Sequence, residues 1–310
     1  MKIFQAGDCW LFSEGLAAVK IKNHYGFIDK HGDIIIDPKY DDASGFSEGL
    51  AAVKVGKKYG FIDRTGNMVL APQFGFTIAF TEGLASVVND NDFFVIDKNG
   101  NTIITLDDNT SDLEHFSCGL AATEFQYETD DDITFKYGFI NRSGRMAIKP
   151  QFDYVGPFTD GLAVATLVPD GPSGYIDTSG RFVIESQFDE AENFSEGVAP
   201  VKKDGKWCFI DITGAQVAML GDRFDSVFSL TEGRSVVRIG DKYGAIDKVG
   251  NLIIDARYDL LLGFSEGLAF ARTGDTQGFI NTSGVFEIQK AIPKPTLIDI
   301  LKGRKKHLRW

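Results

Sequence analysis

The sequence contains few of the residues that build cross-links, metal sites or membrane spans. Its three cysteines, Cys9, Cys118 and Cys208, are too few and too scattered for a disulfide framework or a zinc site. The four histidines show neither His-x-x-x-His nor Cys–His spacing. No run of eighteen apolar residues occurs, and residues 1–8 lack the apolar core of a signal peptide. These absences predict a cytoplasmic protein without a metal site or a transmembrane segment.

Motifs of the common catalytic and nucleotide-binding folds are also missing. The sequence has no Gly-x-Ser-x-Gly elbow, no P-loop and no dinucleotide fingerprint. Its 34 glycines stand at expected turns, so their number is no evidence for phosphate binding. We therefore expect a protein that is not an enzyme and that carries no cofactor.

Basic residues are scarce in the body of the chain and concentrated at its end. Residues 290–310 hold seven Lys/Arg against one acid, a net charge of +6. Since the whole chain has a net charge of −12, residues 1–289 carry −18. A body of this charge repels nucleic acid and anionic membrane. We therefore divide the chain into an acidic body, residues 1–289, and a basic tail or end cap, residues 290–310.

The body consists of eight copies of one pattern, best seen in Phe46-Ser47-Glu48-Gly49-Leu50 followed by Tyr59-Gly60-Phe61-Ile62-Asp63 and Gly66. Intervals of ten, seven and seventeen residues between landmarks give a basic period of 34. The glycine of the first motif recurs at Gly15, Gly49, Gly83, Gly119, Gly161, Gly197, Gly233 and Gly267. A period of this length indicates a repeat array in which each unit needs its neighbours for stability.

Each unit is predicted to be a three-stranded antiparallel meander. Residues 50–55 and 59–63 have the short β-branched and aromatic pattern of strands, and residues 63–66 that of a β-turn. A third strand, 67–70, is expected to end before Pro72, which cannot donate to a sheet ladder. The recurring phenylalanines, such as Phe46, are expected to pack between neighbouring units.

The motifs resemble the WG β-repeat family of bacterial proteins, also called KWG repeats. The resemblance covers about residues 10–290, and rests on Phe-Ser-Glu-Gly-Leu-Ala-Ala-Val-Lys, Tyr-Gly-Phe-Ile-Asp and Pro-x-Tyr/Phe-Asp. The Trp-Gly pair of the family is mostly Tyr-Gly here, and Trp207 is followed by Cys208 instead of glycine. The resemblance implies a repeat scaffold and supplies no catalytic residues.

Whether the array is open or closed depends on its ends. Three strands in 34 residues fall short of the usual four-stranded propeller blade, and no strand is evidently left to be shared between the two termini. We therefore predict an all-β, open, solenoid-like array, with a closed propeller-like ring as the alternative. Residues 1–10 are then expected to cover one end of the array as a degenerate third strand.

Two recurring acidic positions are candidates for ion binding. The first comprises Glu14, Glu48, Glu82, Asp160, Glu196, Glu232 and Glu266. These acids could form a row for calcium or a basic partner, but we favour a role in capping the tight turn before a strand. The Asp-x-x-Gly turns, such as Asp97 to Gly100, lack the alternating carboxylates of a calcium loop.

Two departures from the repeat are predicted to contact a partner. The fourth copy has a first hairpin that is longer by eight residues, with aromatic side chains and an acidic tip. The tail contains a basic cluster that either lies against the acidic body or recognises an acidic surface. The predicted contact residues are Phe125, Tyr127, Glu128, Asp130, Asp131, Asp132 and Phe135 of the hairpin, with Arg304, Lys305 and Lys306 of the tail.

The sequence therefore predicts a binding scaffold that recognises another protein along one face, and a basic protein is one candidate. Two alternatives remain: a carbohydrate or cell-envelope binding module, and an inhibitor or immunity-type protein that blocks a basic partner. The burial of the recurring aromatic side chains distinguishes the carbohydrate-binding alternative from the protein-binding scaffold. Solvent-facing Tyr25, Tyr59, Tyr137, Trp207 and Tyr243 would suit stacking on sugars, whereas buried rings belong to the core.

Overall fold

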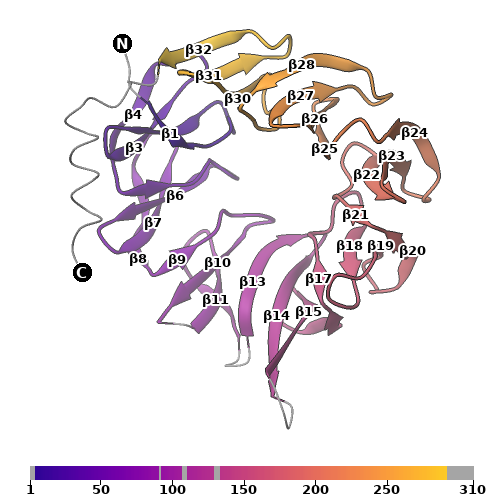
Figure 1. Cartoon of the computed structure of the whole chain (residues 1–310). Coiled ribbons are helices and arrows are strands. Elements are labelled where there is room, and N and C mark those ends of the chain that lie inside the picture. The colour runs from indigo at the N-terminus through magenta and orange to yellow at the C-terminus, as the bar shows by residue number, and fades with distance from the viewer. Residues whose placement is uncertain (1–3, 91, 107–109, 129–132, 292–310) are drawn as a thin grey trace, which may run out of the picture.

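The protein is an all-β ring of eight four-stranded blades, a β-propeller, in a computed structural model that describes residues 4–90, 92–106, 110–128 and 133–291 (Figure 1). Blades 1 to 4 comprise β1 (Phe4–Cys9), β2 (Ala17–Ile21), β3 (His24–Ile28) and β4 (Ile34–Tyr40); β5 (Asp42–Ala43), β6 (Leu50–Val55), β7 (Lys58–Asp63) and β8 (Met68–Phe74); β9 (Phe76–Thr77), β10 (Leu84–Asn89), β11 (Asp92–Asp97) and β12 (Thr102–Thr105); β13 (Thr110–Ser117), β14 (Leu120–Glu128), β15 (Ile133–Asn141) and β16 (Met146–Phe152). Blades 5 to 8 comprise β17 (Tyr154–Val155), β18 (Ala163–Thr166), β19 (Ser173–Ile176) and β20 (Phe182–Phe188); β21 (Glu190–Ala191), β22 (Val198–Lys203), β23 (Lys206–Asp211) and β24 (Gln216–Gly221); β25 (Ser226–Thr231), β26 (Arg234–Ile239), β27 (Lys242–Ile246) and β28 (Leu252–Tyr258); β29 (Leu260–Leu261), β30 (Leu268–Thr273), β31 (Thr276–Asn281) and β32 (Phe286–Ala291).

The expected all-β array of eight repeats is confirmed, but the expected three strands per repeat are one too few. The additional first strand has six to eight residues in β1, β13 and β25 but only two in the other five blades, where β5, for example, follows β4 after the single residue Asp41. Such a segment carries no readable alternation of apolar and polar residues, and the sequence pattern therefore indicated a loop. The outer strand β8 also runs to Phe74, past the expected end at Leu70, because Pro72 lies on an edge strand whose outer side needs no donor.

The open array is not confirmed; the alternative, a closed propeller, is the observed fold. Blade 1 begins with its own first strand, β1, and blade 8 ends with its own fourth, so the ring closes without a shared strand. Residues 4–9 are therefore the first strand of blade 1 and not an end cap. In Figure 1 the first strand of a blade lies toward the centre of the ring and the fourth toward its outer edge.

Closure uses the same contacts as every other interface between blades. Eight buried apolar clusters occur among the described residues, and each lies between two successive blades. The cluster that joins the two ends contains Phe12 and Val19 of blade 1 with Phe270 and Phe279 of blade 8. The rings of Phe12 and Phe279 lie 4.7 Å apart, the same spacing as Phe61 and Phe80 between blades 2 and 3. The expected packing of the recurring phenylalanines between units is confirmed.

Candidate functional site

The two faces of the ring carry different turns. Because successive strands alternate in direction, the turns after the first and third strands of a blade emerge on one face, here called the turn face. The hairpins between second and third strands emerge on the opposite face, here called the hairpin face. The recurring acids belong to the turn face, and the long hairpin β14–β15 belongs to the hairpin face.

The recurring acids of the turn face join neighbouring blades. The Glu14 carboxylate accepts a hydrogen bond of 3.0 Å from the backbone N–H of Gly49 in the next blade. At the closure of the ring, Glu266 accepts the same bond, also 3.0 Å, from Gly15. Equivalent bonds run from Gly83 to Glu48, Gly119 to Glu82, Gly197 to Asp160, Gly233 to Glu196 and Gly267 to Glu232. Seven of the eight interfaces therefore have this bond, and the eighth has Cys118 at the position of the acid.

These bonds give the acids a structural role that differs in detail from the expected one. Each acid caps the turn of the next blade, whereas the sequence pattern suggested capping within its own unit. Each also has a positive φ, 52° at Glu48, which is unfavourable for a residue with a Cβ and needs compensating contacts. Four of the acids are further paired with a base of the next blade: Lys98 with Glu48, Arg142 with Glu82, Lys248 with Glu196 and Lys30 with Glu266.

The second recurring position, which is Asp in six blades and Asn in two, closes a turn in every blade. The Asp63 carboxylate accepts backbone hydrogen bonds from Thr65 at 2.9 Å and Asn67 at 3.0 Å. The same two bonds occur at Asp29, Asp97, Asn141, Asp177, Asp211, Asp247 and Asn281. The turn interpretation is confirmed. Within the described ranges, no group of three or more His, Cys, Asp and Glu residues is arranged to hold a metal ion.

The carboxylates between blades make the ring sensitive to acid. Burial alone would raise the pKa of Glu48, but hydrogen bonds from Lys98 and the N–H of Gly83 outweigh it and hold the pKa below its ordinary 4.5. Glu196 and Glu266 show the same lowered pKa for the same opposing causes. A group whose pKa is lowered by folding stabilises the fold above its ordinary pKa, and this contribution disappears as pH falls through the folded value.

We therefore expect the melting temperature to fall between about pH 5 and about pH 3, and to fall less steeply in a triple variant with Glu48→Gln, Glu196→Gln and Glu266→Gln. Calorimetry at several pH values measures both slopes. The variant is also expected to melt lower than the wild type at neutral pH, where the charged bonds are intact. Parallel slopes for the two proteins would contradict a role of these carboxylates in acid sensitivity.

The aromatic positions that distinguish sugar binding from core packing are mostly not exposed. Trp207 and Tyr25 are buried, and Tyr59, Tyr137 and Tyr243 are half-buried. Each of the half-buried rings lies near the inner strands, where Tyr59, for example, donates a hydrogen bond of 2.6 Å to Asp42. The rings therefore do not form a row of open stacking platforms.

The predicted contact residues of the long hairpin in blade 4 differ in their surroundings. Phe125 is 8% exposed and packs between blades 3 and 4, so its side chain supports the base of the hairpin. Tyr127 and Glu128 continue β14 and pair with Thr134 and Ile133, whereas Asp130, Asp131 and Asp132 lie outside the described residues. Phe135 is 45% exposed and is the apolar side chain that the described hairpin presents to solvent.

The hairpin contacts blade 5 and extends into a surface on that blade. Lys136 Nζ donates to the carbonyl of Leu167 at 3.4 Å and lies 3.7 Å from the Asp153 carboxylate. Leu167 and its neighbour Val168 are exposed, as is Tyr154 on the first strand of blade 5. We call Phe135, Tyr154, Leu167 and Val168 the hairpin-face patch. Figure 1 shows β14 and β15 extending beyond the other strands.

Acidic side chains gather beside this patch. Burial, followed by the carboxylates of Glu192 and Glu114, raises the pKa of the Tyr154 phenol. Burial and then Glu124 raise the pKa of Tyr137 to about 12, with smaller effects of Asp112 and Glu114. These shifts indicate a negative potential on the inner side of blades 4 to 6.

Two cavities lie between inner strands elsewhere in the ring. One, of about 420 Å³, is lined by Trp10, Asp42, Tyr59 and Phe76, together with small and aliphatic residues of blades 2 and 3. The other, of about 250 Å³, is lined by Phe228, Tyr243 and residues 260–263 of blades 7 and 8. The sequence pattern did not indicate the first of these cavities, because it predicted loops at Asp42 and Phe76 and an end-capping third strand at Trp10.

The comparisons with known proteins agree with this geometry. The family model of the WG containing repeat matches residues 25–59, 59–91, 137–167, 174–207, 223–243 and 243–276, which together exceed half of the chain. The chain belongs to the WG β-repeat family. No curated protein matches the WG-repeat chain in sequence.

Solved structures show that the WG-repeat chain shares its fold with distant propellers. The crystal structure of the eukaryotic initiation factor covers 94% of this chain and 90% of its own, with a TM-score of 0.61 and 12% identity. Dihydro-heme d1 dehydrogenase NirN in complex with DHE covers 92% of this chain and 74% of its own, with a TM-score of 0.54 and 10% identity. At such low identity the likeness shows the fold alone.

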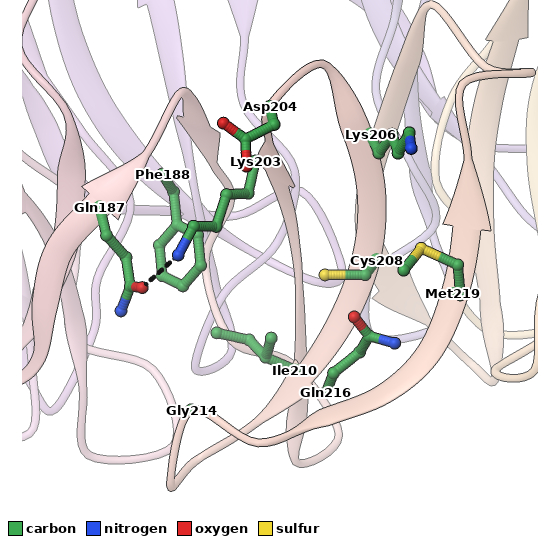
Figure 2. A pocket seen from close by; sticks show the side chains of 10 residues that line it. All are labelled: Gln187, Phe188, Lys203, Asp204, Lys206, Cys208, Ile210, Gly214, Gln216 and Met219. Atoms are coloured by element: carbon green, nitrogen blue, oxygen red, sulfur yellow. Dashed lines mark hydrogen bonds between the residues drawn. The ribbon is translucent and has the colours of Figure 1, made fainter.

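The glycine of the WG pair is replaced in blade 6, and a cavity of about 330 Å³ lies beside the replacement. Figure 2 shows Cys208 and Met219 on one side of this outer cavity, and Lys203 with Gln187, joined by a hydrogen bond of 2.7 Å, on the other. Burial raises the pKa of the Cys208 thiol, which therefore stays protonated and is a poor nucleophile. The cavity reflects local repacking and brings no reactive group together.

Two further predictions concern the basic tail and the absence of a transmembrane segment. Arg304, Lys305 and Lys306 lie in the tail outside the described residues. Among residues 4–291, gaps excepted, there is no apolar helix of membrane-spanning length.

Proposed function

We propose that this WG-repeat propeller is a non-catalytic scaffold that binds a basic protein through the hairpin face of blades 4 and 5. The observation that carries the proposal is the hairpin-face patch. Phe135 is exposed on the longest hairpin, its neighbour Lys136 donates to the carbonyl of Leu167, and Leu167, Val168 and Tyr154 of blade 5 are exposed as well. An exposed apolar patch rimmed by charges is typical of protein-binding surfaces. The neighbouring carboxylates, among them Glu114 and Glu192, select for positive charge in the partner.

A non-catalytic role is supported by the way the recurring polar residues are used. The acids that repeat through the chain, such as Glu48 and Asp63, are bonded to backbone N–H groups within or between blades. They hold the ring together and leave the variable hairpins for recognition. A basic enzyme, which the acidic surface would block, is one kind of positively charged partner that this surface suits.

The test is capture of partners from a lysate of the source cells, followed by mass spectrometry and a measurement of affinity for the protein captured. The double variant Phe135→Asp and Val168→Asp is expected to lose at least about tenfold in affinity, because two exposed anchors are replaced by charges. Added salt is expected to weaken the wild-type complex, because acidic and basic surfaces attract less when screened.

The control is Val55→Asp, which places one such charge on the exposed end of the corresponding hairpin in blade 2. It is expected to keep the wild-type affinity. Capture of no basic partner by the wild-type protein, or equal loss in the control, would refute the proposal.

A further inference from the structure

The cavity between the inner strands of blades 1 to 3 has aromatic walls from three different blades. Trp10 follows β1, Tyr59 lies on β7 and Phe76 begins β9. The rings of Tyr59 and Phe76 are 6.0 Å apart and nearly perpendicular, at 79°. Trp10 is 51% exposed and Phe76 is 53% exposed, although both are large apolar residues. Exposed aromatic side chains that converge on one cavity indicate a binding site and not a core.

One charged residue stands among these walls. Asp42 is the single ionisable residue besides Tyr59 in the lining that the structure describes, and the lining contains no Lys, Arg or His. Its carboxylate accepts a hydrogen bond of 2.6 Å from the Tyr59 hydroxyl and one of 2.9 Å from the N–H of Ala43. Burial and then this contact with Asp42 raise the pKa of Tyr59 to about 12. The phenol therefore stays neutral and donates its hydrogen bond to the Asp42 carboxylate.

The Tyr59 ring already attracts a cation of the protein. Lys54 Nζ lies 5.2 Å from the centre of the ring, on the strand next to β7, and is not part of the cavity lining. Lys54 is the cross-strand partner of Tyr59, and the matching pairs Lys20–Tyr25 and Lys202–Trp207 make the same contact, so the ring at this position accepts a neighbouring ammonium group. A ligand in the cavity has Trp10 and Phe76 available in addition, neither of which contacts Lys54 in this way.

We propose that this cavity binds a small molecule that carries a quaternary ammonium group. Aromatic faces attract cations through their negative quadrupole, and the Asp42 carboxylate adds a full charge. The remaining lining is mostly apolar, and its three hydroxyl groups, those of Ser44, Ser47 and Thr77, already donate to backbone carbonyls. The cavity therefore disfavours a strongly hydrated primary ammonium and suits one covered by methyl groups. A volume of about 420 Å³ lies in the range of small-molecule sites. The site is distant in the chain from the hairpin-face patch and does not depend on its function.

The corresponding cavity of blades 7 and 8 provides a natural comparison within the same ring. Tyr243 stands there at the repeat position of Tyr59, but Leu260 replaces Phe76, and the lining includes no carboxylate. Its volume is also smaller, about 250 Å³. The combination of three aromatic rings and a carboxylate is therefore a property of blades 1 to 3 and not of the repeat in general.

Calorimetric titration with choline tests the proposal on the unaltered protein. Choline is expected to bind, and its neutral isostere 3,3-dimethylbutanol, which has the same shape without the charge, is expected to bind at least about tenfold more weakly. Glycine betaine, whose carboxylate would be repelled by Asp42, is also expected to bind more weakly than choline. Equal binding of choline and the isostere, or no binding of choline, would overturn the proposal.

Variants locate the site. Trp10→Ala and Phe76→Ala are each expected to weaken choline binding by about fivefold to tenfold, and both residues are exposed enough for the fold to tolerate the change. Asp42→Asn is expected to reduce the preference for choline over the isostere. Phe228→Ala, in the other cavity, is expected to change nothing, and a loss there equal to that of Phe76→Ala would overturn the assignment.

A peptide carrying trimethyllysine distinguishes the source of the ammonium group. We expect it to bind no better than choline, because Asp42 and the three rings recognise only the cationic head. Binding of the peptide without binding of choline would overturn the assignment to a small molecule.

Discussion

Replacing Phe12 with alanine is expected to destabilise the protein by about 3–5 kcal/mol, as much as the same replacement at Phe46. Phe12 is 1% exposed and its ring lies 4.7 Å from Phe279, across the junction of the first and last blades. Phe46 is 2% exposed and packs in the same way on Phe27, between blades 1 and 2. Both variants remove a buried ring from an interface between blades. Chemical denaturation of the two variants measures the comparison.

The comparison separates a closed ring from an open array. In an open array Phe12 would lie at a free end, and its replacement would cost much less than that of Phe46. Ile35→Ala provides the control, because Ile35 is an exposed residue of an outer strand and its truncation is expected to cost less than about 0.5 kcal/mol. A full effect at Phe46 with a negligible effect at Phe12 would contradict closure of the ring by this contact.

Sequence alone predicted the repeat, its strands and its buried aromatic positions, because these depend on local patterns. The Asp63 turn and the strands around Phe61 follow from residue types within a few positions of each other. Closure was predicted only as the alternative to an open array, since it depends on the curvature accumulated over eight interfaces. The ends meet through Gly15, Glu266 and the Phe12 cluster, which look like any other copy of these motifs in the sequence.

Of the two candidate sites, the long hairpin was predicted from the sequence and the cavity of blades 1 to 3 was not, again because only local patterns can be recognised in a sequence. The insertion before Phe135 interrupts the period and was visible in the sequence. The cavity of Trp10, Asp42 and Phe76 was missed, because Asp42 and Phe76 lie in first strands of only two residues and Trp10 follows a segment expected to cap the array. The neighbours of these residues in space also come from other repeats. Trp10 stands two residues before Phe12, and Phe76 four residues before Phe80. Tabulating these two positions in every copy would have drawn attention to the aromatic side chains.

A large effect of a single added methyl group is expected at Gly60, the glycine of the motif that defines the family. A Cβ at this position would lie 2.4 Å from the carbonyl oxygen of Leu70 on the outer strand. The contact is this close because β8 has two extra residues between the partners of Tyr59 and Phe61, and the resulting bulge places its backbone against Gly60. We expect Gly60→Ala to cost about 3 kcal/mol, measured by chemical denaturation.

The control for Gly60 is Gly45→Ala, where an added Cβ meets no atom within 4 Å. It is expected to change stability by less than about 0.5 kcal/mol. Blade 6 supports the interpretation, because Cys208 occupies the equivalent position and the outer strand there has only one extra residue, between Ala218 and Gly221. A side chain is thus accommodated where the bulge is smaller. Equal stability of Gly60→Ala and the wild type would show that the bulge yields without cost, and the glycine of the WG pair would then need another explanation.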